Sequence, residues 1–115
     1  MQSPITTHVL DTSIGCPAKG VHVTLDFQDN GTAWKTIATG MTNADGRLAD
    51  LLPESAKLAR GIYRLTFDTA SYFHNQDVHG FYPSVMVIFE ISDPSAHYHV
   101  PLLLSPHGYT TYRGS

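Results

Sequence analysis

The C-terminal stretch HYHVPLLLSPHGYTTYRGS, residues 97–115, carries the pattern that decides the fold class of this chain. It begins with His97 and His99, and a β-strand places two residues at this spacing on one face. An apolar run follows, turn residues at 105–108 interrupt it, and alternating aromatic and hydroxyl residues then resume the strand pattern. C-terminal tails are usually frayed and tolerant of change, so a strand pattern up to the last residues indicates that this end has a function.

The same alternation recurs upstream, most cleanly at residues 21–27. Clusters of Gly, Pro, Asn and Asp separate the segments, and residues 29–31 are typical of a hairpin turn. A short helix is predicted at 69–75, capped by Asp68 or Thr69, and one or two helical turns at 53–60. About eight short strands between turns predict an all-β sandwich or barrel. We expect the strands at 5–10, 21–27, 34–42, 47–51, 61–68, 83–91, 97–104 and 109–112.

The length and composition are typical of one globular domain, which we expect to span residues 1–115. The chain is 42% hydrophobic and 15% charged, with a net charge of −3 and no block of Lys or Arg. This balance argues against nucleic acid or an anionic membrane surface as a partner. The single cysteine, Cys16, excludes an intrachain disulfide framework. With no signal-like N-terminus and no long apolar run, a cytoplasmic location is expected.

Seven histidines raise the question of a metal site. Structural zinc sites need closely spaced Cys and His ligands, and only His97 and His99 are close in this sequence. A third ligand would have to come from His8 or Asp11, on a strand whose neighbours the sequence does not define. We therefore expect neither a metal ion nor a cofactor.

Acid–base chemistry is the stronger hypothesis, because histidine titrates near neutral pH and serves as base and then as acid in one cycle. His8, His99 and Arg47 lie within strands or directly after a turn, next to apolar or small residues. A single histidine is more often structural. Arg47 either pairs with Asp45 or Asp50 at the surface or orients a flat, anionic heterocycle, and the sequence weighs these two interpretations equally.

Other nucleophiles lack the sequence context that they need. Cys16 lies in a turn with no helix terminus or basic partner that would lower the pKa of its thiol. The serines lack a Gly-x-Ser-x-Gly elbow, and no glycine-rich phosphate loop is present. If the chain is an enzyme, water activated by histidine is the expected nucleophile.

Several stretches together resemble the 5-hydroxyisourate hydrolases, the transthyretin-like enzymes of urate breakdown. The end YRGS at 112–115, preceded by HYHVPLLLSP at 97–106, looks like the signature of that family. HVLD at 8–11 and GCPA at 15–18 resemble its first strand and turn. TNADGR at 42–47 resembles its arginine-bearing turn, and FYP at 81–83 its approach to the long apolar strand. The resemblance covers the chain from about residue 5 to its end. Hormone-carrying transthyretins are similar in fold but lack the YRGS end and have lysine in place of His8.

The resemblance implies a transthyretin-like (prealbumin-like) β-sandwich of two four-stranded sheets with one short helix. It also implies a homotetramer, a dimer of dimers whose active sites lie at the dimer–dimer interface and use more than one subunit. The implied reaction hydrolyses 5-hydroxyisourate to 2-oxo-4-hydroxy-4-carboxy-5-ureidoimidazoline. Catalytic residues carried over from the family are His8, Arg47, His99 and Ser115, and substrate-binding residues are His8, Arg47, Tyr112, Arg113 and Gly114. His107 stands where an aromatic residue is more usual, which leaves the channel rim undefined.

In this scheme His99 is the base, His8 positions water or shuttles a proton, and Arg47 orients the substrate and stabilises charge. The sequence does not decide whether His8 or His99 takes the proton. The C-terminal segment with Tyr112 and Ser115 would close the pocket, its carboxylate fixing a histidine tautomer or Arg113.

Two alternatives stay open at this point. The chain could be a carrier of small aromatic ligands in a transthyretin-type channel, or a structural sandwich in which the histidines have no role. His22, His74 and His79 are expected to be outward-facing strand or loop residues without a function.

Overall fold

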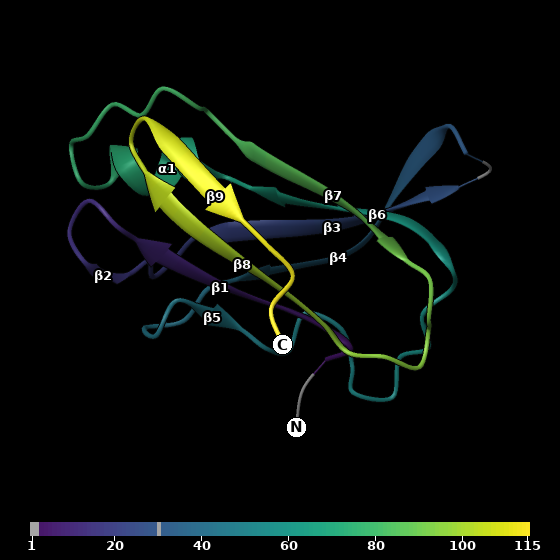
Figure 1. Cartoon of the computed structure of the whole chain (residues 1–115). Helices are drawn as coiled ribbons and strands as arrows, with labels where there is room; N and C mark the ends of the chain where they lie inside the picture. Colours follow the sequence, from purple (N-terminus) through teal and green to yellow (C-terminus); the bar gives the residue numbers. More distant parts are fainter. Residues whose placement is uncertain (1–2, 30) are drawn as a thin grey trace.

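Two β-sheets pack face to face in this chain, with one short helix at one end of the sandwich (Figure 1). The structure is a computed structural model that describes residues 3–29 and 31–115. The all-β architecture is therefore as predicted. The described residues form β1 (Ile5–Asp11), β2 (Cys16–Pro17), β3 (His22–Asp29), β4 (Ala33–Met41), β5 (Arg47–Leu48), β6 (Gly61–Phe67), α1 (Thr69–His74), β7 (Val85–Ile91), β8 (Tyr98–Ser105) and β9 (Gly108–Thr111).

One sheet has the order β2-β1-β8-β9, with β5 also paired to β1, and the other has the order β4-β3-β6-β7. The expected four-stranded sheets thus become one of five strands and one of four. The difference arises at β1, whose one edge pairs in parallel with β8 along its whole length. Two-residue strands share the other edge, β5 opposite Thr7 and His8 and β2 opposite Leu10 and Asp11.

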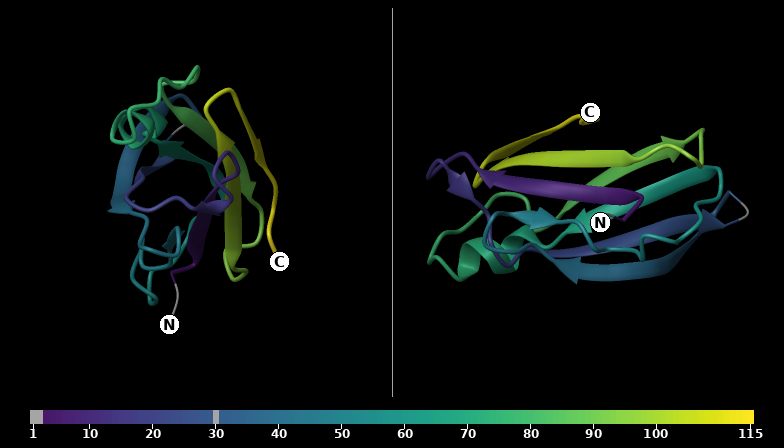
Figure 2. Two further views of the ribbon diagram at one scale, coloured as in Figure 1. Left: turned by 90° about the vertical axis from the view of Figure 1, so that its left-hand side faces the viewer. Right: turned by 90° about the horizontal axis from the view of Figure 1, so that it is seen from below.

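The core lies between the sheets and is made of every second residue of the strands. Figure 2 shows the two layers from the side. Ile5 and Val9 of β1 and Leu102 of β8 are fully buried there, against Leu25 of β3 and Leu65 of β6. The alternation therefore assigns one face of each strand to the core and leaves the residues between for the outer face.

The helix is confirmed, and its cap is the predicted Asp68, whose Oδ1 accepts a hydrogen bond from Ser71 N at 3.1 Å. α1 is tied to the sandwich by the Tyr72 hydroxyl, which donates to Asp11 Oδ2 at 2.7 Å. Both residues are buried, so this bond crosses the interior. No helix in the described part of the chain is long and apolar enough to cross a membrane.

The helical prediction for residues 53–60 is wrong. One turn forms, in which Ala56 N donates to Pro53 O at 2.9 Å, and the backbone then continues without helix. The Tyr63 hydroxyl donates to Ala59 O and accepts from Ala59 N, at 2.8 and 3.1 Å. These local side-chain bonds, between residues four positions apart, satisfy backbone groups that a helix would otherwise pair.

Smaller differences concern strand length and turns. The strand predicted at 47–51 ends at Leu48, and β2 lies within a segment expected to be only a turn. β3 and β4 pair as the expected antiparallel hairpin, with Thr32 N donating to Asp29 O at 3.2 Å. Asn30 of that predicted turn, and Met1 and Gln2 of the predicted leaderless N-terminus, lie outside the described residues.

Candidate active site

The outer face of the five-stranded sheet collects His8, Arg47 and His99 from three strands. In the parallel β1–β8 register Thr6 lies opposite His99 and His8 opposite Pro101. In the antiparallel β1–β5 register His8 lies opposite Arg47. Residues opposite one another in a ladder project to the same face. The pairing of β1 with β5 and β8 therefore places the three predicted catalytic side chains on one surface.

His99 is half-buried, and Thr6 holds its inner nitrogen. The Thr6 hydroxyl lies 2.8 Å from His99 Nδ1, and within the described residues no hydrogen bond engages His99 Nε2. Burial lowers the pKa of His99 below its ordinary value of 6.5, and the positive charge of His97, His8 and Arg47 lowers it further. His99 is accordingly mainly a neutral imidazole at pH 7, and its Nε2 is a base in the tautomer that carries the proton on Nδ1.

His8 is held by the turn that precedes Arg47. Its Nε2 lies 3.0 Å from the carbonyl oxygen of Asp45. A carbonyl oxygen only accepts, so Nε2 carries a proton, and in the neutral imidazole Nδ1 keeps a free lone pair. His8 thus offers an acceptor to a ligand while the turn fixes its orientation.

Arg47 leaves the same turn with its backbone fixed. The Asn43 side-chain oxygen accepts from Asp45 N at 2.9 Å and from Arg47 N at 3.0 Å. Gly46 has φ +72°, and a Cβ there would collide with the Val9 carbonyl oxygen, so only glycine fits this turn.

The Arg47 guanidinium is exposed. In the described part of the chain the only ion pair within 4.0 Å joins Arg64 and Asp26. Arg47 therefore pairs with neither Asp45 nor Asp50, and its charge is available to a ligand.

The C-terminal segment lies against His99. Gly114 N donates to His99 O at 2.8 Å in an isolated antiparallel bridge. A Cβ on Gly114 would come within 2.5 Å of His99 Cδ2 and 3.3 Å of Pro101 Cγ. Only a residue without a side chain can approach the imidazole this closely, and Ser115 follows directly.

Tyr112 and Arg113 lie elsewhere within the single chain. The Arg113 guanidinium carbon stands 4.6 Å from the centre of the Tyr98 ring, a cation–π geometry. Arg113 and Tyr112 line a cavity of about 140 Å³ together with Val87 of β7 and Val100 of β8. Val100 belongs to the core side of its strand, so these two side chains are not grouped with His8 and His99. Their contact with substrate stays a prediction.

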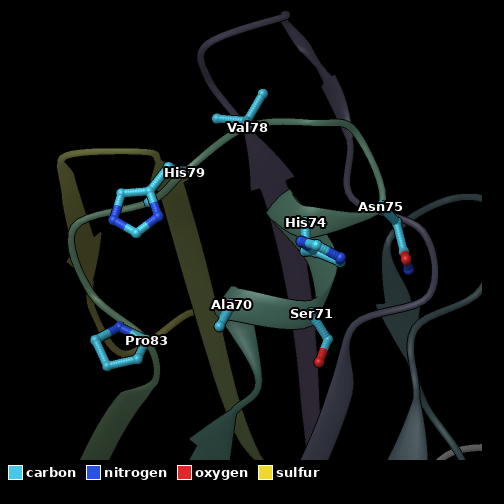
Figure 3. A pocket seen from close by; sticks show the side chains of 8 residues that line it. Ala70, Ser71, His74, Asn75, Val78, His79 and Pro83 are labelled. Carbon is cyan, nitrogen blue, oxygen red and sulfur yellow. The ribbon is translucent and has the colours of Figure 1, made fainter.

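The remaining histidines divide into two groups. His22 is exposed on β3, and His107 is exposed in the β8–β9 turn. Figure 3 shows a larger cavity, of about 430 Å³, whose walls include the imidazoles of His74 from α1 and His79 from the loop after it. Both lie in the segment around α1. No group of three or more His, Cys, Asp or Glu residues in the described ranges could hold a metal ion.

Two residues at the site were not recognised from the sequence. Thr6 looks like any other strand threonine, since only the parallel register brings it beside His99. His97 was noted for its spacing from His99, but its contact with Thr6, at 3.3 Å from Nε2 to Oγ1, depends on the same register.

The fold and this surface define a class: β-sandwiches of two packed sheets that carry titratable side chains on the outer face of one sheet. The family model described as HIUase/Transthyretin matches residues 5–114. The chain belongs to the HIUase/transthyretin family, as the resemblance indicated. The transthyretin-like fold is likewise confirmed.

Known proteins of both branches are similar to the chain. The 5-hydroxyisourate hydrolase of Salmonella dublin is 48% identical over 112 residues, which cover 96% of this chain and 80% of that protein. The solved structure of Klebsiella pneumoniae 5-hydroxyisourate hydrolase is 38% identical, with a TM-score of 0.81 and coverage of 96% and 92%. The solved structure of sea bream transthyretin in complex with thyroxine is 35% identical, with a TM-score of 0.90 and coverage of 97% and 95%.

Proposed function

We propose that this chain hydrolyses 5-hydroxyisourate to 2-oxo-4-hydroxy-4-carboxy-5-ureidoimidazoline in urate degradation. The relatives of that name support the assignment. The structural observation that carries it is the grouping of His8, Arg47 and His99 on one face, with the chain end against His99. This face combines a neutral base, a second oriented imidazole and an unpaired planar cation, which are the groups that hydrolysis of a cyclic ureide needs.

In the proposed mechanism His99 Nε2 takes a proton from a water molecule while the water oxygen adds to a ring carbonyl. The negative charge that develops on the carbonyl oxygen is stabilised by Arg47. As the tetrahedral intermediate collapses, the C–N bond breaks and the imidazolium returns its proton to the leaving nitrogen. The lowered pKa of His99 supports its role as the base, since the neutral form predominates at pH 7.

His8 has the complementary role in this proposal. Its Nδ1 lone pair accepts a hydrogen bond from the attacking water or from a ring N–H, because Nε2 is committed to Asp45 O. Ser115 follows the bridge at Gly114 and is proposed to close the site beside His99. No cofactor or metal takes part in this scheme.

A carrier of small aromatic ligands is the second candidate, favoured by the likeness to sea bream transthyretin with thyroxine. Turnover separates the two functions. The first experiment follows the ultraviolet decay of freshly generated 5-hydroxyisourate with and without the protein. We expect accelerated decay that falls about a hundredfold in the His99→Asn variant. Decay at the spontaneous rate from folded protein would favour the carrier.

We further propose a homotetramer, a dimer of dimers. β7 and β9 are the edge strands next to each other on the two sheets, and each leaves one edge unpaired in the described chain. Exposed apolar side chains accompany these edges, with Met86 at 53% and Ile88 at 60% exposure on β7 and Tyr109 at 42% on β9. Edges of this kind favour pairing with a second copy. Light scattering after size exclusion measures the assembly.

Assembly also bears on Tyr112 and Arg113, which the single chain does not bring to its own histidines. We propose that Tyr112 and Arg113 contact the substrate at the histidines of a neighbouring subunit. We also propose one domain over residues 1–115. A cytoplasmic location is proposed as well, because the exposed, unpaired thiol of Cys16 suits a reducing compartment.

A further inference from the structure

Thr6 lies on the outer face of β1, in register with His99, yet only 3% of its surface is exposed. The Thr6 hydroxyl lies between the imidazoles of His97 and His99. Thr6 Oγ1 lies 2.8 Å from His99 Nδ1 and 3.3 Å from His97 Nε2. The three groups form a chain from the half-buried His99 to the exposed His97.

Hydrogen-bond stoichiometry restricts the protons of this chain. A threonine hydroxyl has one proton to donate, so it donates to one imidazole and accepts from the other. When it donates to His97 Nε2, His99 carries its proton on Nδ1 and its Nε2 is a base. When it donates to His99 Nδ1, His97 carries a proton on Nε2 and His99 presents an N–H at its own Nε2. The hydroxyl thus couples the tautomers of the two histidines.

We infer that Thr6 and His97 form a proton relay behind His99 that sets its tautomer and carries its excess proton to solvent. This inference rests on the proposed hydrolase function, in which His99 Nε2 takes a proton from water. The relay moves one proton per bond. As Nε2 gains a proton, Nδ1 gives its own to Thr6 Oγ1, and Thr6 gives its hydroxyl proton to His97 Nε2. The positive charge ends on His97, and reversal of the same transfers returns a proton to the leaving nitrogen.

The surroundings of the two imidazoles give this transfer a direction. His99 is half-buried and faces His8 on β1 and Arg47 on β5 in addition to His97, so positive charge is disfavoured on its ring. His97 is exposed, and water stabilises an imidazolium there. A hydroxyl between the rings moves the charge outward without a movement of either side chain.

Four variants test the relay by kcat and by its pH profile. Thr6→Val removes the hydroxyl at nearly constant shape, and Thr6→Ser restores it. His97→Gln keeps a hydrogen-bonding group near the position of Nε2 but has no basic nitrogen to accept the relayed proton. His97→Ala opens the Thr6 hydroxyl to added imidazole. The matched controls are Thr66→Val on β6 and His22→Gln on β3, both in the other sheet.

We expect kcat to fall about tenfold in Thr6→Val and His97→Gln, to recover in Thr6→Ser, and to stay unchanged in both controls. In His97→Ala, imidazole should raise kcat with concentration after subtraction of the enzyme-free rate, while the native protein shows no such rise. Nitrogen-15 spectra of the imidazoles should show an altered tautomer of His99 in Thr6→Val. The Thr6→Ser and Thr66→Val proteins should keep the native tautomer.

The outcomes distinguish a failure of the proposed hydrolase function from a failure of the relay. A native protein without turnover refutes the proposed function. Native turnover with unchanged kcat and pH profile in folded Thr6→Val and His97→Gln refutes the relay and leaves the hydrolase intact. A lower kcat in Thr6→Val together with an unchanged kcat in His97→Gln restricts Thr6 to a structural role and also refutes the relay.

Discussion

Replacement of Gly114 by alanine tests whether the C-terminal segment positions the base. Gly114 has no positive φ, so alanine can adopt its backbone conformation and the change acts through contact alone. The new Cβ would lie 2.5 Å from His99 Cδ2, whereas carbon atoms in contact are about 3.5–4.0 Å apart. Either the imidazole or the chain end must therefore move by about 1 Å.

A displacement of that size at a base is expected to lower kcat by about a hundredfold. The assay is the ultraviolet decay of fresh 5-hydroxyisourate, with the free energy of unfolding and the oligomeric state measured in parallel. Gly108→Ala is the matched control, because the nearest atom to its Cβ, Ser105 Oγ, is at an ordinary 3.9 Å. A Gly114→Ala protein with kcat within twofold of the native value would refute the argument that this close approach positions His99.

Four further predictions concern pH and stability. Because burial and neighbouring positive charge lower the pKa of His99 below 6.5, the neutral base persists below that pH, and the acid limb of kcat/KM should have its midpoint below 6.5. The same shift means that the unfolded chain binds the proton first, so urea midpoints should decrease as pH falls from 6.5 through the folded pKa. Tyr72→Phe leaves the buried Asp11 carboxylate without one donor and should lower the free energy of unfolding by about 1.5–3 kcal/mol. Tyr82→Phe, at an exposed ring, should change it little, and equal effects of the two changes would contradict the role of the buried bond. Asp77 has φ +56°, so Asp77→Gly should raise the free energy of unfolding by about 0.5–1 kcal/mol. Urea denaturation measures this quantity, and a lower free energy of unfolding in Asp77→Gly would contradict strain at this residue.

Local patterns were sufficient for the long strands, the helix α1 and the β3–β4 hairpin, but not for β2, for the end of β5 or for residues 53–60. Alternation over two residues assigns the core and outer faces of β1, β3 and β8 without knowledge of their neighbours. The cap at Asp68 and the turn that leads to Arg47 depend on groups only a few residues apart, so they too are visible in the sequence. The pattern singled out His8, Arg47 and His99 as candidates, and the family resemblance supplied their expected catalytic roles, which strand patterns alone do not distinguish from structural ones.

The tertiary structure decided which segments meet, because hydrogen-bonded ladders impose no sequence signature on their partners. The parallel pairing of β1 with β8 joins residues more than ninety positions apart and brings the unremarked Thr6 between His97 and His99. The sequence alone thus determined the faces of the strands and the kinds of side chain available for chemistry. The long-range register, set by packing of the whole sandwich, determined which of those side chains touch.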